Sequence, residues 1–580
     1  MDSPSKIALD FHPSWHQGPS LHLNSNEHQE RNSITESTHD SEMTQDLNAN
    51  STQRPAVESE SFASDRQTKP DVSVDITEAP ASNDEPRRPL SKKQKITESL
   101  QKTKDALYQY AKFIGPGFMV AVAYIDPGNY ATDVAAGASF RFALLFVILM
   151  SNMFAIFLQS LSVKLGTVTG KNLAENSREH LPKWMNIIIY VLAEVAIIAT
   201  DVAEVIGFAI ALNVLGNVPL VAGCAISIVD VLIILLFYNP SGSTKAVRMF
   251  EYFVMLLVLG VVFCFCFQLS LIKNTSFGDV IRGYLPSKAV VQSEGLYQAC
   301  GILGATVMPH SLYLGSGLVQ PRLREFDQQL SAANGEKPDN SSTDSVAAAE
   351  YRPSVQAIKT CLNFSVVETA VSLFTFALFV NSAILIVAGA SLFNTPGAGD
   401  ADLFGIHDLL SSTVAPAAGT IFALALLLSG VSAGIVCTIA GQMVSEGSLR
   451  WTIKPWIRRM ITRSISITPS IIIAGAVGRS GLSAALVASQ VCLSVILPFV
   501  SAPLIYFTCR DRFMTISAVH SPGDNLARDE TGDNMSEKEG KTEDVKMTNS
   551  RLTSVFALVI WLVIVVMNVT LLVLIGLGKA

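Results

Sequence analysis

Long apolar runs constrain the fold of this 580-residue chain more than any other feature. Of its residues 49% are hydrophobic and 16% are charged, and most of the charge lies between the apolar runs. A helix needs about 20 mainly apolar residues to cross a hydrocarbon core of about 30 Å. The sequence therefore predicts an all-α polytopic membrane protein. The predicted spans are 112–134, 142–165, 185–210, 218–238, 249–271, 295–319, 360–390, 417–443, 461–478, 482–508 and 553–577.

The distribution of Lys and Arg predicts how these spans are oriented. Basic residues concentrate before the first span and after the second, fourth, sixth, eighth and tenth spans, which places these segments in the cytoplasm. Residues 391–416, on the opposite side, contain three Asp and no Lys or Arg, whereas 272–294 is an exception with three basic residues. We expect a cytoplasmic N-terminus and a C-terminus on the opposite side. The pattern leaves open whether the membrane is the plasma membrane or that of the vacuole, Golgi or endosome.

The polar segments predict tails and linkers rather than further domains. Residues 1–105 are rich in Ser, Asn, Glu and Asp, so we expect a disordered cytoplasmic tail. Residues 509–552 are expected to form an acidic and basic cytoplasmic linker with no fold of its own, and 553–580 carry the last span. The net charge of −7 argues against a nucleic-acid partner. The eight Cys lack CxxC spacing, so we expect neither a disulfide framework nor a thiolate metal site.

The first span is interrupted by the sequence Asp126-Pro127-Gly128-Asn129. Proline removes a backbone donor and glycine loosens the chain, so the helix should break here. A carboxylate in the middle of a membrane costs at least about 2.5–3.5 kcal/mol, which favours a position facing an ion, a partner or water. The alternative is a kinked helix in which Asp126 only caps the second half.

The sixth span is interrupted in the same way at Pro309, between Met308 and His310. If residues 106–271 and 295–508 form two inverted repeats of five helices, the two breaks lie at corresponding positions. Two broken helices at such positions mark the substrate site of many transporters.

The side chains at the breaks indicate a metal rather than an organic substrate. Asp126 and Asn129 offer oxygen, whereas Met308 offers a soft sulfur that magnesium and calcium do not favour. Such a set favours manganese, iron, cobalt or cadmium, although a Met can also serve only for packing. His310 can exchange protons near neutral pH, or it can be a hydrogen-bonded structural residue.

Further polar residues lie inside the predicted spans. Glu194, Asp201 and Glu204 share one face of the third span and form either a proton relay or a static ion-pair network. Their candidate partners are Arg458 and Arg459. Gln490 in the tenth span makes either a helix-to-helix hydrogen bond or a contact to metal or water. We expect structural roles for the remaining acids, which are Asp133, Asp230, Glu251 and Glu368.

Several motifs together resemble the Nramp family of divalent-metal/proton symporters, and most closely its fungal branch. These are DPGN in the first span, VTGKNLAE after the second, TDVAEVIG in the third, MPHSLYLGS in the sixth, and AGQMVSEG followed by RRMITRS. The resemblance covers about residues 110–510. It implies a leucine-transporter-type fold of two inverted five-helix repeats with an added eleventh helix. Many family members carry a second His where this chain has Gly315.

The resemblance also implies roles for individual residues. The implied metal ligands are Asp126, Asn129, Met308, the carbonyls of Ala123 and Ala305, and Gln490. The implied proton route consists of Asp126, His310, Glu194, Asp201, Glu204, Arg458 and Arg459.

The function expected from these observations is proton-coupled symport of manganese or ferrous iron toward the cytoplasm. The partners are then divalent metal ions, protons and the lipid bilayer, with the metal as substrate and no cofactor. The alternative is a transporter of the same fold for a small organic substrate such as an amino acid. A metal-gated channel is a further class. An enzyme is disfavoured, since the sequence contains no nucleophile–base pair and no multi-His cluster.

Overall fold

The computed structural model describes residues 115–229, 244–273, 275–333, 351–396, 402–449, 455–517 and 544–578. These ranges are helical apart from loops and two three-residue strands. Eight helical segments within them are long and apolar enough to cross a membrane. They are α4 (Leu145–Thr169), α6 (Lys183–Gly216), Met249–Leu271 of α9 (Thr244–Leu271), Ser293–Ala332, Val355–Ser391, α17 (Pro416–Leu449), α19 (Arg479–Thr508) and α21 (Arg551–Gly576).

The first and sixth predicted spans are each divided into two helices. The first consists of α2 (Pro116–Val122) and α3 (Pro127–Phe140), and the sixth of α11 (Ser293–Thr306) and α12 (Pro309–Leu318). Both second halves begin with proline, which is suited to the first helical position because its missing N–H is not needed there. The two breaks predicted from proline are therefore confirmed.

The seventh predicted span is interrupted by an irregular turn, and the fourth predicted span is described only in part. The seventh contains α14 (Val355–Ser372), a π-helical turn η4 (Leu373–Ala377) and α15 (Leu378–Ser391). Such turns occur mainly as single insertions in α-helices, and the apolar pattern did not predict this one. In the fourth span α7 (Leu220–Ile226) is described, whereas residues 230–243 lie outside the described ranges.

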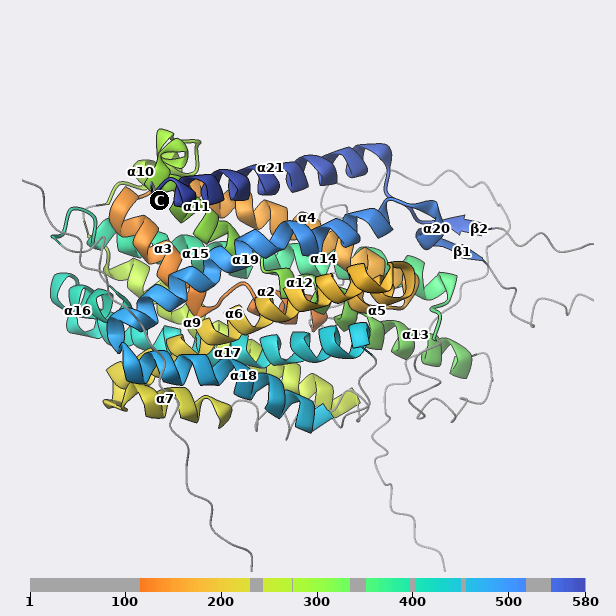
Figure 1. Ribbon diagram of the computed structural model, residues 1–580, viewed down its shortest axis with the longest axis horizontal. Helices are drawn as coiled ribbons and strands as arrows, with labels where there is room; N and C mark the ends of the chain where they lie inside the picture. Colours follow the sequence, from red (N-terminus) through yellow and green to blue (C-terminus); the bar gives the residue numbers. More distant parts are fainter. Residues whose placement is uncertain are drawn as a thin grey trace, which may run out of the picture. The chain divides into compact units, whose positions relative to one another are not determined.

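Helices from the two halves pack on each other around the breaks (Figure 1). The third helices of the predicted repeats, α6 and α17, are both 34 residues long and lie against each other. In addition α3 packs on α15, and α2 on α14. The short helix α12 contacts α2, α4, α17 and α19. Both breaks are thereby held within the helical bundle.

Apolar exposure distinguishes the helices that contain the breaks from those at the periphery. In the segment Ser293–Ala332, 94% of the most apolar window is buried, whereas in α21 only 22% is buried. Phe263 of α9 and Leu552 of α21 are among many large apolar side chains that are exposed. Such a surface suits a lipid bilayer, which supplies the apolar surroundings that water would not.

Short elements complete the described fold. The helices are α5 (Leu173–His180), α10 (Phe277–Gly283), η1 (Lys288–Val291), α13 (Gln320–Ala333), α16 (Leu403–Thr413), α18 (Pro455–Ala476) and α20 (Asp511–Met514). The strands β1 (Thr515–Ser517) and β2 (Asp544–Lys546) pair antiparallel, with Ile516 opposite Val545.

The two strands correct our expectation that the linker before the last span has no regular structure. Asp511 accepts hydrogen bonds from Thr548 at 2.7 Å and Lys546 at 3.3 Å, and the Met547 amide donates to the Met514 carbonyl at 2.8 Å. These contacts join segments more than 30 residues apart, which a local reading of polarity could not reveal. The predicted tail, residues 1–105, lies outside the described residues.

Candidate functional site

The first break is stabilised by the carboxylate of Asp126. This residue is extended, with φ −126° and ψ 163°, and it is the N-cap of α3. Its oxygens accept hydrogen bonds from the backbone N–H groups of Gly128 and Asn129, each at 3.1 Å. The side chain is fully buried. Asp126 therefore does cap the second half-helix, and the positive end of the α3 dipole faces its charge.

The prolines at both breaks release one backbone carbonyl each. The carbonyls of Ala123 and Ala305 lie four residues before Pro127 and Pro309, so neither can accept the usual helical hydrogen bond from the residue at i+4. The Ala305 carbonyl instead accepts a hydrogen bond from the Asn129 side chain at 3.2 Å. This contact joins α3 directly to the end of α11.

Three oxygens converge on the amide nitrogen of Asn129. They are Asp126 Oδ1 at 2.5 Å, the Tyr124 carbonyl at 3.1 Å and the Ala305 carbonyl at 3.2 Å. The side-chain nitrogen of Asn381, on α15, also donates to the Tyr124 carbonyl at 3.3 Å and to Asn129 Oδ1 at 3.4 Å. An arrangement of oxygens around one positively polarised atom can also accept a small cation.

The second break begins at Met308, which is extended and fully buried. Its carbonyl accepts a hydrogen bond from Ser311 Oγ at 2.7 Å. The same hydroxyl lies 2.9 Å from the Tyr124 hydroxyl, and Gln159 Nε2 donates to both hydroxyls at 2.9 Å. These polar contacts join the first break to the second at the side of α12. The two breaks, at Asp126 and Met308, are thus joined by two sets of hydrogen bonds, one through Asn129 and Ala305 and one through Tyr124 and Ser311.

Gln490 of α19 lies against the first break. A Cβ atom added to Gly128 would overlap its amide group, so only glycine permits this approach. Gln490 Nε2 donates to the neighbouring Ser489 hydroxyl at 3.0 Å. Its Oε1 is buried and has no hydrogen-bond partner among the described residues. Of the two alternatives for Gln490, the helix-to-helix hydrogen bond is absent from the described part of the chain, and the side chain offers an oxygen without a hydrogen-bond partner there.

His310 connects the second break to α6. Its ring is 1% exposed, and Nδ1 lies 3.3 Å from the Thr200 hydroxyl. Thr200 directly precedes Asp201 on α6. One turn beyond His310, Gly315 has no room for a side chain, because a Cβ atom there would collide with the amide oxygen of Gln159. A histidine at that position would require Gln159 to move.

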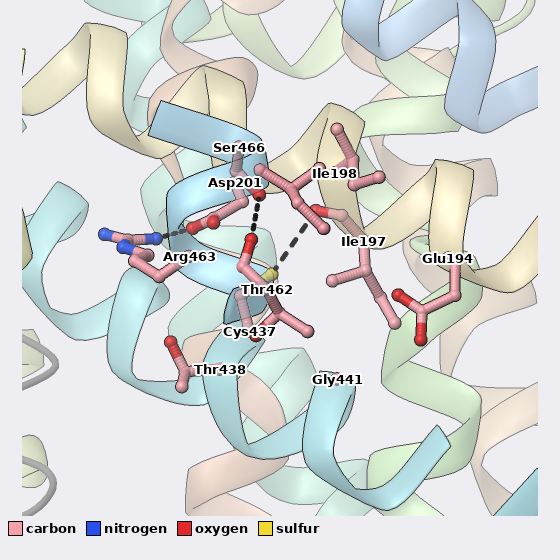
Figure 2. Close-up of a pocket in the computed structure, with 11 residues that line it drawn as sticks. Glu194, Ile197, Ile198, Asp201, Cys437, Thr438, Gly441, Thr462, Arg463 and Ser466 are labelled. Carbon is pink, nitrogen blue, oxygen red and sulfur yellow. Dashed lines mark hydrogen bonds and ion pairs between the residues drawn. The ribbon is translucent and has the colours of Figure 1, made fainter. Parts of the chain in front are cut away.

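The acids on α6 meet an arginine that our sequence analysis did not select. Arg463 of α18 forms an ion pair with Asp201 (Figure 2). It also lies 3.7 Å from Glu204 Oε2. Its side chain is 2% exposed. The side chains of Arg458 and Arg459, which we had selected, lie outside the described residues. Arg463 is one helical turn after Arg459 and so shares its face, which is a signal the sequence did contain.

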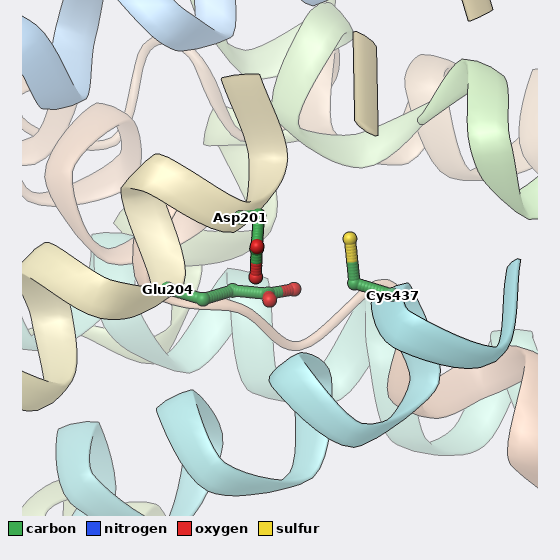
Figure 3. Close-up of side chains that lie close together, drawn as sticks. All are labelled: Asp201, Glu204 and Cys437. Carbon is green, nitrogen blue, oxygen red and sulfur yellow. The ribbon is translucent and has the colours of Figure 1, made fainter. Parts of the chain in front are cut away.

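Asp201 and Arg463 line a pocket between α6, α17 and α18 (Figure 2). The third acid, Glu194, lines the same pocket on the side away from Arg463. Asp201 and Glu204 also lie near Cys437 of α17 (Figure 3). The possible ligand atoms of the three residues lie within 4.8 Å of one another. The Cys437 thiol donates to the Ile197 carbonyl at 3.7 Å. Because the guanidinium of Arg463 already pairs with Asp201 and lies near Glu204, the cluster suits a charge network rather than a second metal ion.

The other buried acids divide into two kinds. Glu368 accepts hydrogen bonds from the N–H groups of Gly115 at 3.0 Å and Gly117 at 3.1 Å, and it pairs with Arg322 at 2.8 Å. It has the structural role that we expected. Asp133 is fully buried, and neither of its carboxylate oxygens has a hydrogen-bond partner among the described residues. Asp230 lies outside the described ranges.

Sequence reasoning therefore missed several residues at the breaks. Gln159 and Asn381 are polar residues in apolar runs, a signal that was available and not used. The Tyr124 carbonyl gave no signal, because every residue carries such a group and only the fold brings this one to Asn129.

Comparison with known proteins gives one consistent result. Residues 117–523 match the family model for natural resistance-associated macrophage protein-like (Nramp) proteins. The chain is 50% identical to the manganese transporter SMF1 of Saccharomyces cerevisiae, with 82% of this chain and 88% of that protein covered. It is 49% identical to the iron transporter SMF3 of the same yeast, with 80% and 95% covered.

A solved structure is similar as well. The manganese transporter of Eremococcus coleocola is 30% identical to the chain, with a TM-score of 0.62 over 78% of this chain and 84% of that one. The family match covers more than half of the sequence, and the relatives match over most of their own length. The protein therefore belongs to the Nramp family.

Proposed function

We propose that this protein is a transporter that carries divalent transition-metal ions, manganese or ferrous iron, toward the cytoplasm together with protons. The observation that supports this most is the convergence of Asp126 Oδ1 and two backbone carbonyls on the Asn129 amide nitrogen. Related proteins of similar length are named manganese and iron transporters. Transport by such a protein is not an enzymatic reaction.

The ion would lie among the oxygens that now surround the amide nitrogen of Asn129. Turning this amide about its last torsion would present Oδ1 to the ion in place of Nδ2. Asp126 and the Ala305 carbonyl would remain as oxygen ligands. The oxygens of Ala123 and Gln490 and the sulfur of Met308 would complete the set. Because sulfur is a soft donor, the set would reject calcium and magnesium better than oxygen donors alone.

The proton route would lead from the metal site to the acids of α6. Asp126 binds a proton or a metal ion, but a proton on its carboxylate weakens binding of the metal. His310 lies beside Thr200, next to Asp201, so that it can pass protons between the second break and α6. Glu194, Asp201 and Glu204, with Arg463, Arg458 and Arg459, would form the continuation of this route.

The direction of transport follows from the proposed orientation. With the N-terminus in the cytoplasm, α2 lies on the cytoplasmic side of the first break and α3 on the opposite side. The ion would enter beside α3 and leave beside α2.

The same fold could in principle carry an amino acid, whose carboxylate would bind at the N-terminus of a half-helix. That position at α3 already holds the carboxylate of Asp126, which accepts both available N–H groups. A second carboxylate would be repelled, so the site disfavours this substrate.

The proposal is tested by manganese uptake into proteoliposomes that contain the purified protein. We expect uptake to rise when the outside is made more acidic than the lumen, and to persist in a large excess of calcium. Uptake should be lost in Asp126→Ala. Vesicles with folded, correctly oriented protein and no manganese flux would refute the proposed substrate. Flux that ignores the pH gradient would refute proton coupling alone.

A further inference from the structure

Asp133 is a buried carboxylic acid to which the described part of the fold gives no hydrogen-bond partner. It is fully buried in α3, and neither oxygen has a hydrogen-bond partner among the described residues. An unsatisfied buried polar group costs about 1–3 kcal/mol, and an ionised carboxylate costs more. Glu368, in contrast, has two N–H donors and Arg322. The structural role that we expected for both acids therefore fits Glu368 and does not fit Asp133.

Asp133 lies on the same face of α3 as the proposed metal site. Asp126, Asn129 and Asp133 are spaced i, i+3 and i+7, which brings them onto one side of a helix. With a rise of 1.5 Å per residue, Asp133 lies about 10 Å along α3 from Asp126. One turn before Asp133, the Asn129 side chain touches both α11, at Ala305, and α15, at Asn381.

The residues one turn after Asp133 touch the same two helices. A Cβ atom on Gly137 would collide with the backbone carbonyl of Leu385 on α15. Ala136 belongs to a buried cluster with Leu385 and with Ile302 of α11. Since the turns before and after it both contact α11 and α15, Asp133 lies at the junction of α3, α11 and α15.

We propose that Asp133 is a second binding site for the transported divalent cation, which the ion occupies between the far end of α3 and the site at Asp126. This inference rests on the proposed function. The cation supplies the partner that the described residues do not. A carboxylate here lowers the cost of moving a double charge through a region of low dielectric constant. The proposed site offers a hard oxygen and no sulfur, so discrimination between metals stays at Met308.

The first test compares manganese uptake by wild type, Asp133→Asn and Asp133→Glu in proteoliposomes. Asparagine keeps the volume and removes the negative charge, so uptake at low manganese concentration should fall about tenfold. Glutamate restores the charge and should recover most of the uptake. Equilibrium manganese binding in detergent should show that Asp133→Asn keeps the affinity of the Asp126 site, which is intact, and loses the second site. Wild-type uptake by Asp133→Asn would overturn the inference.

Thermal unfolding separates this role from a structural one. If Asp133 has no protein partner, Asp133→Asn and Asp133→Leu should unfold at the wild-type temperature or higher while they lose uptake. A lower unfolding temperature accompanied by loss of manganese binding would overturn the inference in favour of a structural role. If the wild type itself carries no manganese, the proposed function fails. If the wild type transports and Asp133→Asn equals it, only this inference fails.

A thiol at the same position provides a readout that depends on ligand chemistry. Asp133→Cys replaces a hard oxygen with a soft sulfur, which cadmium prefers over manganese. Cadmium should therefore inhibit manganese uptake by Asp133→Cys at a lower concentration than in the wild type, which carries the same eight native Cys. An unchanged inhibition curve would contradict direct contact between residue 133 and the ion.

Discussion

The two helix breaks share the same backbone arrangement but carry side chains of different chemistry. Each half-helix begins with proline, and each proline frees a carbonyl one turn earlier. At the first break Asp126 caps α3 with two hydrogen bonds. At the second break Met308 occupies the capping position of α12 and makes no side-chain cap. The first break thus carries an ionisable carboxylate, and the second carries an uncharged sulfur.

In the proposed site Asp126 would mainly provide affinity for cations, and Met308 would mainly provide selectivity among metal ions. The carboxylate of Asp126 attracts any cation, and its cap also stabilises α3. A methionine stabilises a helix N-terminus poorly, so Met308 contributes donor chemistry rather than helix stability. Substitutions at the two breaks should therefore have different consequences for transport, stability and selectivity.

The largest effect is expected at Asp126. Asp126→Asn keeps a side chain that caps as well as aspartate, whereas Asp126→Ala loses about 1 kcal/mol of capping free energy. Both variants lose the negative charge and should lose manganese uptake, but only Asp126→Ala should unfold at a lower temperature. Uptake and thermal unfolding measured on the same preparations test this. Substantial uptake by Asp126→Asn would show that the charge is dispensable.

A smaller but still large effect is expected at Gly128. Alanine at this position would collide with the Gln490 amide, which lies at the flexible end of its side chain and can move aside at little cost in stability. Gly128→Ala should displace Gln490 from the first break and lower manganese uptake about tenfold.

The control is Gly216→Ala at the end of α6, where the added Cβ would lie 3.7 Å from the Val218 side chain, an ordinary van der Waals distance. That variant should transport as the wild type does. Equal uptake by both alanine variants would mean that the approach of Gln490 to the first break has no role in transport.

The smallest effect on manganese uptake is expected at Met308. Met308→Leu conserves the volume, so its stability should stay within about 1.5 kcal/mol of the wild type. Removal of the sulfur leaves oxygen donors, which calcium accepts. Manganese uptake should fall severalfold, and calcium should become an effective competitor. The measurement is a calcium titration of manganese uptake, and an unchanged titration would mean that Met308 only packs.

Sequence patterns predicted the features that depend on local chemistry. The apolar runs predicted the membrane helices, and Pro127 and Pro309 predicted both breaks. The charge spacing on α6 predicted an acidic face that meets arginine. Each of these signals lies within a few residues, where helix geometry alone relates sequence to structure.

Features that depend on contacts between distant segments were not predicted. Among the described side chains Arg463 is a partner of Asp201, because the packing of α18 on α6 decides which turn of α18 faces the acid. The pairing of β1 with β2 joins segments on either side of residues 518–543, and neither strand has an apolar pattern of its own. The convergence of the Tyr124 and Ala305 carbonyls on Asn129 likewise depends on the fold.

The central claim is that both breaks contribute ligands to one metal ion. X-ray absorption spectroscopy of the purified protein loaded with one equivalent of cadmium tests this most directly, since sulfur and oxygen ligands scatter differently. We expect a first shell of oxygens with one sulfur in the wild type, and an all-oxygen shell in Met308→Leu, with cadmium binding lost in Asp126→Ala. A wild-type shell without sulfur, or a sulfur signal that persists in Met308→Leu, would contradict a site shared by the two breaks.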